Sequence, residues 1–227
     1  VRRQRQMCIR DRYYIVKGDI MIKNIIFDLG GVILEIDKNK TISAFENLGI
    51  NFHQIIDIEF WEDLNTKFSG AYSLSQFSEK IRHESNTKIS NEEIEKAWVA
   101  LLGNFDLEKM RWLKSLSKNY KLFLFSNTDS IHVKEFEKKC LEQCGKPLES
   151  YFEQTYYSNK LLLRKPDSKS FDKVIKLSNI LPDETIFIDD KLENVEAARK
   201  SGLFAHQLTS PSKLTQLDFV NIENIIY

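Results

Sequence analysis

Residues 22–33 read Ile22-Lys-Asn-Ile-Ile-Phe-Asp-Leu-Gly-Gly-Val-Ile33, and this stretch decides the fold. It is a short apolar run that ends in an aspartate and two glycines. An apolar run of this length, closed by a turn signal, is typical of a buried β-strand. The stretch therefore predicts a strand over residues 22–27 that stops at a turn, with Asp28 at its carboxyl end.

The rest of the chain alternates between similar apolar runs and amphipathic stretches. The runs predict strands at 122–125, 152–157, 185–188 and 204–208, and the stretches predict helices at 40–48, 107–117, 167–177 and 193–201. One more helix, with Ile131, Val133 and Phe136, is expected after the second strand. Continuous apolar strands that alternate with helices are typical of a parallel sheet covered on both faces. The sequence therefore predicts an α/β fold with a Rossmann-like parallel sheet core.

Residues 51–103 interrupt this alternation. They show no strong strand signal and contain three amphipathic segments, near 53–67, 73–84 and 90–102. Ser73 and Ser90 open the second and third segments with the spacing of a capping box. We therefore expect an inserted α-helical cap over residues 37–103 and a core domain made of residues 21–36 and 104–227. The large aromatic residues of the insertion, among them Tyr72 and Trp98, are interpreted as core packing.

Composition and charge argue against several classes of protein. The 227 residues include 33 Lys and Arg and 33 Asp and Glu, so the net charge is zero and no basic excess favours nucleic-acid binding. No apolar run reaches the roughly 18–20 residues that span a bilayer, so we expect no membrane association. The three cysteines do not make a disulfide framework, and Cys140 and Cys144 are expected to be plain thiols. We expect a cytoplasmic monomer or homodimer.

Residues 1–20 differ from the rest of the chain. The string from Val1 to Arg12 is basic and nonperiodic and has no apolar segment of the kind found in secretory signals. A basic arm or a targeting segment is one interpretation, but a sequence typical of a folded protein starts only at Met21. We expect residues 1–20 to be an artefactual or disordered extension and exclude them from the functional argument.

Polar residues of complementary kinds follow three of the predicted strands. They are Asp28 after the first strand, Ser126 and Asn127 after the second, Asp189 and Asp190 after the fourth, and Arg164 and Lys165 in the loop before the helix at 167–177. In open α/β sheets, ligands bind beyond the carboxyl ends of the strands. Phosphoryl transfer needs such groups, because its catalysis rests on positioning and on neutralising charge. The pattern predicts a phosphoryl-transfer site.

Four motifs in this order resemble those of the haloacid dehalogenase superfamily. They are Phe27-Asp-Leu-Gly-Gly-Val-Ile33, Leu124-Phe-Ser-Asn-Thr128, Arg164-Lys-Pro166, and Phe187-Ile-Asp-Asp190 with Asn194. The match runs from Met21 to about Leu208, and the insertion looks like that family's helical cap. The first two motifs are more narrowly similar to a bacterial subgroup that includes glucose-1-phosphate phosphatases. The resemblance implies a magnesium-dependent phosphatase acting on a small phosphorylated metabolite, with a sugar phosphate favoured.

The resemblance also implies the roles of the catalytic and substrate-binding residues. Asp28 would attack phosphorus and form an aspartyl phosphate, which suits a group that is already ionised at neutral pH. Ser126 and the backbone of Asn127 would bind the transferring phosphoryl group. Lys165 would hold Asp28 and the phosphate oxygens together by charge, and Arg164 would contact the substrate.

A magnesium site is implied at the same edge of the sheet. Its expected ligands are the Asp28 carboxylate, the carbonyl oxygen of Gly30 and the acidic pair Asp189 and Asp190. Mg²⁺ takes few protein carboxylates and keeps several waters, and two adjacent carboxylates repel each other unless a cation lies between them. We expect Asp190 to bind the ion directly, Asp189 to act through water, and Asn194 to orient these ligands from behind.

Gly30 is a departure from the family's pattern. Most phosphatases of the superfamily have a second aspartate at this position, two residues after the nucleophile, which protonates the leaving group. General acid–base help of this kind contributes about 10²–10⁴-fold in rate. Another residue could supply the acid, with Asp37 and Asp129 as candidates, or the leaving group could need little protonation. Alternatively, the protein could bind phosphorylated ligands without turnover.

Several other functions remain open from the sequence. A serine nucleophile at Ser126 is less favoured, because no histidine is placed beside it by the sequence. A haloacid dehalogenase would attack carbon with the same aspartate, and the acidic pair argues against it. A phosphomutase is also less favoured, because it would need the missing acid. The alternative from another class is a non-catalytic module that binds phosphorylated metabolites.

Overall fold

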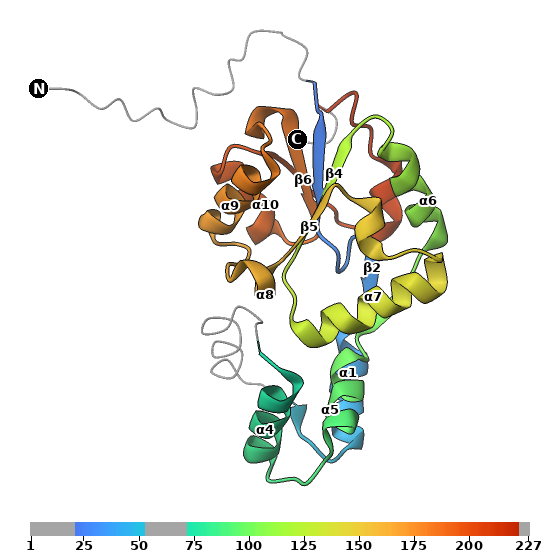
Figure 1. The fold of residues 1–227 in the computed structure, drawn as a ribbon, viewed down its shortest axis with the longest axis vertical. Coiled ribbons are helices and arrows are strands. Elements are labelled where there is room, and N and C mark those ends of the chain that lie inside the picture. Colours follow the sequence, from blue (N-terminus) through green and yellow to red (C-terminus); the bar gives the residue numbers. More distant parts are fainter. Residues whose placement is uncertain (1–20, 53–71, 223–227) are drawn as a thin grey trace, which may run out of the picture.

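A five-stranded parallel sheet forms the centre of the molecule. The computed structural model describes residues 21–52 and 72–222, so the predictions for residues 1–20 and for the helix near 53–67 lie outside the described residues. The strands lie in the order β5-β4-β1-β6-β7 (Figure 1). Their bounds are Asn24–Phe27 for β1, Lys121–Ser126 for β4, Gln154–Tyr157 for β5, Thr185–Asp189 for β6 and Phe204–Gln207 for β7. The predicted α/β fold class is confirmed.

The register of the sheet aligns the carboxyl ends of its three central strands. Phe27, the last residue of β1, lies opposite Leu124 of β4 and Ile188 of β6. Ile25, Ile26 and Phe27 are fully buried, as expected for a central strand covered on both faces. The polar residues that follow these strands therefore emerge at one edge of the sheet.

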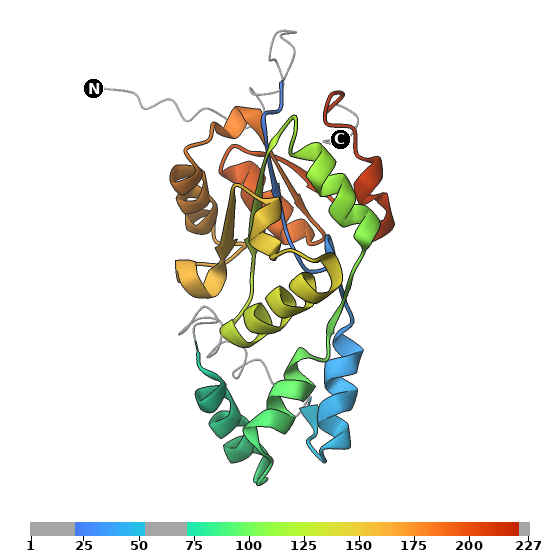
Figure 2. The ribbon, with the colours of Figure 1, turned by 45° about the vertical axis from the view of Figure 1, so that its right-hand side comes forward.

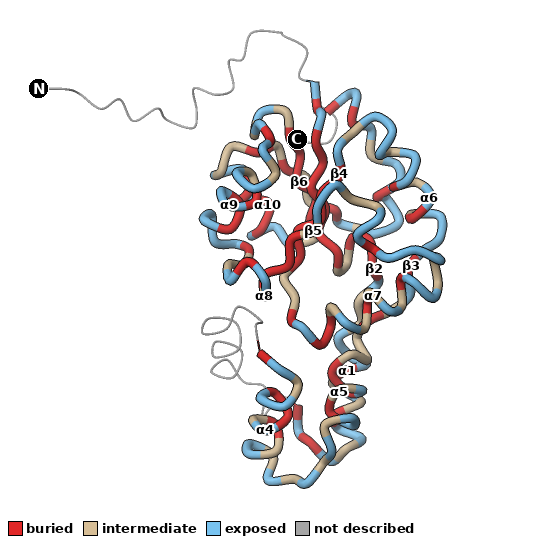
Figure 3. Tube along the Cα trace, in the orientation of Figure 1, coloured by how far each residue is buried: buried red, intermediate tan, exposed pale blue. Residues whose placement is uncertain are grey.

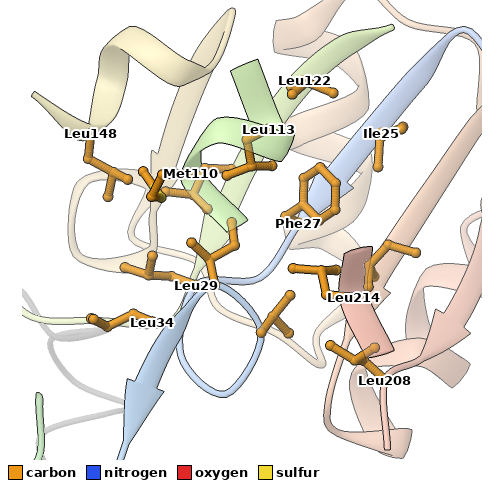
Figure 4. Close-up of a cluster of buried hydrophobic side chains, with 14 of the residues drawn as sticks. Ile25, Phe27, Leu29, Leu34, Met110, Leu113, Leu122, Leu148, Leu208 and Leu214 are labelled. Atoms are coloured by element: carbon orange, nitrogen blue, oxygen red, sulfur yellow. The ribbon is translucent and has the colours of Figure 1, made fainter. Parts of the chain in front are cut away.

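Helices cover both faces of the sheet. On one face lie α6 (Leu107–Leu116), α7 (Ser130–Cys144) and the short helices η3 (Leu148–Tyr151) and η5 (Pro211–Gln216). On the other lie α8 (Ser158–Leu161), α9 (Ser168–Ser178) and α10 (Leu192–Lys200), and η4 (Pro182–Glu184) precedes β6. Ile25 and Phe27 point into the first cluster, with Leu113 of α6 and Leu214 of η5 (Figure 4), while Ile26 points into the second. The alternation of side chains along one strand thus serves two hydrophobic cores.

Within residues 21–52 and 72–222, three further helices form a separate group below the sheet in Figures 1 and 2, which we call the helical lobe. They are α1 (Lys38–Asn47), α4 (Leu74–Ser85) and α5 (Asn91–Val99). Both expected capping boxes are present, Ser73 with Gln76 and Ser90 with Glu93. The lobe has its own hydrophobic cluster, and Ile131 from the first turn of α7 is part of it.

A two-stranded antiparallel ribbon connects the lobe to the sheet, and the sequence analysis missed it. It consists of β2 (Leu34–Ile36) and β3 (Leu102–Phe105), where a helix had been expected to reach residue 102. Strands of three or four residues are too short to show an alternating pattern, and glycine and asparagine in β3 are poor strand formers. The predicted helix therefore ends earlier, at Val99, and tertiary packing places residues 102–105 in a strand.

Gly103 is needed for the close approach of the two ribbon strands. A Cβ atom at this position would lie 2.8 Å from the Cβ of Glu35 and 2.9 Å from its carbonyl oxygen. The carbonyl belongs to the backbone and cannot rotate away. Only glycine therefore fits without shifting the ribbon.

Burial follows this architecture (Figure 3), with the central strands β1, β4 and β6 buried almost throughout. Tyr72 and Trp98 are buried in the lobe at 5% and 2% exposure, in agreement with the core packing expected for them. One cation, Lys165, is also buried, at 2% exposure. Among the described residues, no helix is long and apolar enough to cross a membrane.

We predict that Gly103→Ala destabilises the protein by about 1–3 kcal/mol, because the added methyl group meets the Cβ and the carbonyl oxygen of Glu35. Urea unfolding followed by circular dichroism measures the change. Ser43→Ala, at an exposed position of α1, is the control and should stay within about 0.5 kcal/mol of the parent. An equally stable Gly103→Ala protein would contradict the tight packing of the ribbon.

Candidate active site

The ammonium group of Lys165 is the centre of the candidate site. Its Nζ donates to Oδ1 of Asp28 at 2.7 Å, to Oδ2 of Asp189 at 2.7 Å and to the carbonyl oxygen of Phe125 at 2.8 Å. The three bonds use all of its donors. It also lies 5.2 Å from the ring centre of Phe125 and 5.1 Å from that of Phe187. Lys165 thus joins the ends of β1, β4 and β6.

Asn127 holds the backbone of Lys165 in place. The Nδ2 of Asn127 donates to the carbonyl oxygen of Lys165 at 2.8 Å, and its Oδ1 accepts from the backbone N of Lys165 at 3.0 Å. Two residues later, Asp167 caps α9 by accepting from the backbone N of Lys169 at 2.9 Å. A loop fixed at both ends can keep a long side chain extended into the core. The structure therefore brings the second and third motifs into direct contact.

Asp28, Asp189 and Asp190 form a cluster in which one oxygen of each lies within 4.8 Å of the others. Asp189 is fully buried, and its oxygens also accept from the backbone N of Lys191 at 2.8 Å and twice from the Nδ2 of Asn194 at 3.0 Å. The carboxylate of Asp190 is half-buried and accepts no hydrogen bond from another described side chain.

The close approach of Asp190 to the β1 turn requires a glycine. A Cβ atom on Gly31 would lie 2.8 Å from Oδ2 of Asp190, and Gly31 has a φ of +80°, which side chains other than glycine rarely adopt. The second glycine of the first motif therefore leaves room for the acidic pair.

The buried charges of the cluster are not balanced by the protein alone. Burial raises the pKa of Asp28 to about 6, against the lowering effect of Lys165 and with a further rise from Asp189. Burial and Asp189 likewise raise the pKa of Asp190. Burial lowers the pKa of Lys165, but the two carboxylates beside it outweigh this and raise it. Three carboxylates face one ammonium, so a further cation would be stabilised here.

The donor set suits a hard divalent cation such as Mg²⁺. Carboxylate oxygens are its preferred protein ligands, and it keeps several waters. The Oδ1 of Asn194 is buried and has no hydrogen-bond partner in the described part of the chain, so it could accept a hydrogen bond from such a water. Asp28 and Asp190 could bind the ion directly. Gly30 forms an isolated β-bridge with Leu34, and the role of its carbonyl oxygen as a Mg²⁺ ligand stays a prediction.

Ser126 and Arg164 have side chains available to a ligand. Ser126 is 5% exposed, and its hydroxyl makes no hydrogen bond to a described residue. The guanidinium of Arg164 is half-buried and likewise has no hydrogen-bond partner within residues 21–52 and 72–222. Burial lowers its pKa, and Tyr72 and Glu193 are its electrostatic neighbours. Ser126 lies at the end of β4, and Arg164 lies next to Lys165 in the sequence.

The two aspartates considered as general acids are engaged elsewhere. Asp37 caps α1, and its Oδ1 accepts from the backbone N of Asn39 at 3.0 Å. Asp129 is 5% exposed and has five hydrogen-bond donors around it. Burial raises the pKa of Asp129, but the charge and hydrogen bonds of His132 outweigh it and lower the pKa. A carboxylate held ionised in this way is unsuited to donate a proton.

The sequence alone does not indicate the partners of Asp129. These partners are His132, Trp98 and Tyr72. Trp98 lies more than thirty positions before Asp129 in the chain, and Tyr72 lies more than fifty positions before it. The one local signal was the spacing Asp129-Ser-Ile-His132, which places both side chains at the start of one helix.

Comparison with known proteins identifies the family. A family model described as haloacid dehalogenase-like hydrolase matches residues 22–202, which include all the motifs of the candidate site. The chain belongs to the haloacid dehalogenase-like hydrolase family. The resemblance noted in the sequence is confirmed at this level, and the chain is a hydrolase of that family.

Relatives and solved structures of the family agree with this assignment. A D-ribitol-5-phosphate phosphatase of Bacteroides thetaiotaomicron is 32% identical over 82% of this chain and 92% of its own length. A crystal structure of a haloacid dehalogenase family enzyme from Bacteroides thetaiotaomicron, in complex with magnesium and inorganic phosphate, is 31% identical, with a TM-score of 0.75 over 82% of this chain and 93% of that chain. The L-2-haloacid dehalogenase of Xanthobacter autotrophicus is 17% identical, with a TM-score of 0.55 over 83% of this chain and 78% of that chain, and this similarity shows a shared fold alone.

We predict that Mg²⁺ raises the melting temperature of the purified protein by about 5–10 °C at a free concentration of 100 times its Kd, because it binds only the folded state. Asp190→Asn should remove most of this rise. It should also raise the melting temperature without Mg²⁺, because a carboxyl group with a raised pKa destabilises the fold when ionised.

Thermal unfolding with and without Mg²⁺ measures both effects. Asp183→Asn is the control, because Asp183 is exposed in η4, before the amino end of β6, and should leave both values unchanged. A full Mg²⁺ response in Asp190→Asn would contradict the proposed cation site.

Proposed function

We propose that this hydrolase is a Mg²⁺-dependent phosphatase that removes phosphate from a small phosphorylated polyol or sugar through an aspartyl phosphate on Asp28. The observation that carries the proposal is the position of Lys165, whose Nζ lies 2.7 Å from both Asp28 and Asp189. An ammonium and a carboxylate cluster at the end of a β-strand suit the transfer of a phosphoryl group, whose charge has to be neutralised.

In the proposed reaction, an Asp28 oxygen forms a bond to phosphorus while the bond from phosphorus to the leaving oxygen breaks. The leaving oxygen takes a proton from water. The resulting hydroxide then attacks phosphorus, which releases inorganic phosphate and restores the Asp28 carboxylate. When bound, Mg²⁺ would neutralise charge on the phosphoryl oxygens. Lys165 keeps Asp28 oriented, and the Ser126 hydroxyl donates to a phosphoryl oxygen.

The chemistry of the substrate is proposed from the relatives and from Arg164. One relative is named as a D-ribitol-5-phosphate phosphatase, and its substrate is a sugar-alcohol phosphate. The alignment with this chain covers 92% of that relative's length. In this chain, Arg164 directly precedes Lys165 in the sequence, and its half-buried guanidinium has Tyr72 of the lobe as an electrostatic neighbour. It is suited to bind hydroxyl oxygens or a phosphate oxygen of such a substrate.

Two alternative functions have less support. A haloacid dehalogenase attacks carbon and has no use for a divalent cation, whereas three carboxylates gather around Lys165 here. The similarity to a solved dehalogenase is one of fold alone. Gly30 favours a non-catalytic binding module, because it cannot act as an acid. Turnover in the experiments below would exclude that alternative.

We predict that Asp28→Asn lowers phosphate release from a sugar-alcohol phosphate by about 10³-fold or more, because an amide cannot form the mixed anhydride. The measurement is phosphate release with Mg²⁺ present and after chelation. Asp172→Asn, at an exposed position of α9, is the matched control and should keep full activity. If Asp28→Asn remained active while Ser126→Ala did not, serine would be the nucleophile and the proposal would be wrong.

We predict that Gly30→Asp is faster than Gly30→Asn by about 10²-fold on a primary alkyl phosphate, because only the acid can protonate a poor leaving group. On an activated aryl phosphate, the two variants should agree within about threefold. Gly30 has no positive φ, and its Cβ would meet only the Ile36 side chain, at 3.1 and 3.6 Å, so both variants carry the same steric cost.

Steady-state rates on the two substrates decide this prediction. Equal rates of the Asp and Asn variants on the alkyl phosphate would mean that protonation of the leaving group does not limit this enzyme.

A further inference from the structure

A buried carboxylate connects the helical lobe to the segment that follows Ser126. Asp129 caps α7 three residues after Ser126, and the two oxygens of its carboxylate have different partners. Oδ1 accepts from two backbone N–H groups of the first turn of α7, both at 2.9 Å. Oδ2 accepts from the lobe, from the hydroxyl of Tyr72 and from Nε1 of Trp98, both at 3.1 Å. One oxygen therefore bonds the core alone, and the other also bonds the lobe.

The imidazole of His132 adds an ion pair with Asp129 to this connection. Its Nδ1 lies 2.7 Å from Oδ2 of Asp129, and its Nε2 lies 3.0 Å from the carbonyl oxygen of Trp98. Both partners only accept hydrogen bonds, so both bonds form when the imidazole carries two protons. Burial lowers the pKa of His132, but Asp129 outweighs it and raises the pKa, in agreement with a charged ring. The ring also packs on Trp98, with their centres 5.0 Å apart.

The segment of residues 126–131 runs from the last residue of β4 into the first turn of α7, and we call it the phosphoryl-binding loop. Its two halves are anchored to different parts of the molecule. In the first half, Asn127 bonds the backbone of Lys165, and the backbone N and carbonyl of Thr128 bond the hydroxyl of Ser158 at 3.0 and 2.9 Å. Both anchors belong to the core. The second half bonds the lobe, through Asp129 and through the hydroxyl of Ser130, which donates to the carbonyl of Tyr72 at 2.7 Å.

These contacts lie in one place between the sheet and the lobe. Figures 1 and 2 show the amino-terminal end of α7 between the sheet and α4 and α5. Ile131, in the same turn, is part of the hydrophobic cluster of the lobe. Tyr72 is also an electrostatic neighbour of Arg164, which precedes Lys165. We call these contacts between the lobe and the core the seat of the lobe. The seat therefore lies next to the residues proposed to bind substrate.

We propose that Asp129 is a positioning residue that fixes the seat of the helical lobe against the phosphoryl-binding loop, through Tyr72 and Trp98. This inference rests on the proposed phosphatase function. Asp129 does not touch the reacting atoms in this role. Its effect is to hold lobe residues on the side of the site where the leaving group of the substrate lies.

If Asp129 has this role, the loss of kcat/KM on removing its contacts should depend on the size of the leaving group. A polyol phosphate can use contacts with the lobe as binding energy for the reaction, whereas a minimal phosphate such as acetyl phosphate is too small to gain from them. The anchors of Asn127 and Thr128 do not involve the lobe, so the phosphoryl site should persist without Asp129. Loss of the seat should therefore affect the large substrate and spare the small one.

The test compares kcat/KM on a sugar-alcohol phosphate and on acetyl phosphate for the full chain with Mg²⁺. Asp129→Asn keeps the shape of the side chain but removes its charge. Tyr72→Phe removes the lobe hydroxyl that donates to Asp129. Each should lower kcat/KM on the sugar-alcohol phosphate by about 10-fold or more relative to acetyl phosphate, mostly through KM. In the double variant, the added effect of Tyr72→Phe should be small, because both changes break the same contact.

Tyr156→Phe is the matched control, since its hydroxyl bonds Ser178 within the core at 2.7 Å. It should leave the ratio of the two kcat/KM values unchanged. Hydrogen exchange provides a readout that needs no turnover. In Asp129→Asn, amides of α4 and α5 should exchange faster, while those of β1, β4 and β6 stay protected.

The outcomes separate this inference from the proposed function. Equal losses on both substrates, or unchanged exchange in α4 and α5, would overturn the role of Asp129. If the parent protein released phosphate from neither substrate, the proposed function would fail. Hydrogen exchange alone would then decide whether Asp129 fixes the lobe.

Discussion

The structure depends on one buried ammonium group. Lys165 lies at 2% exposure between carboxylates of two different strands, and it also bonds the end of a third. Removing such a cation would leave buried carboxylates without a partner, which costs far more than the loss of a surface ion pair. The chain therefore fixes Lys165 from its backbone as well, through the side chain of Asn127. The same constraint leaves a net negative cluster that a divalent cation can complete.

Much of the sheet and of the candidate site could be predicted from the sequence, and the reason is geometric. In a parallel sheet, the residues after each apolar run meet at one edge, so Asp28 and Asp189 could be placed together without coordinates. Lys165 follows no apolar run, and its place beside them was implied by the family resemblance alone. Continuous apolar runs also signal central strands strongly. The ribbon of β2 and β3 escaped prediction because three or four residues carry no periodic signal, and Gly103 is there for packing rather than for strand propensity.

The contacts between the lobe and the core could not be predicted for a different reason. Tyr72 and Trp98 look like core residues from the sequence, and both are indeed buried, as is His132. Their polar atoms nevertheless converge on Asp129, because the first turn of α7 enters the hydrophobic cluster of the lobe. A buried polar atom needs a partner, but only the tertiary structure says which one. Gly30 raises the opposite problem, since the sequence shows that an acid is missing and the described residues offer no evident replacement.

The nucleophile is the central claim, and trapping the phosphorylated enzyme tests it most directly. A reaction of the protein with Mg²⁺ and a sugar-alcohol phosphate would be quenched in acid within one turnover, digested and analysed by mass spectrometry. The account predicts one phosphoryl group on the peptide that contains Asp28, lost in mild alkali or hydroxylamine as an acyl phosphate is. A stable phosphate on Ser126, or turnover without any phosphorylated peptide, would contradict it.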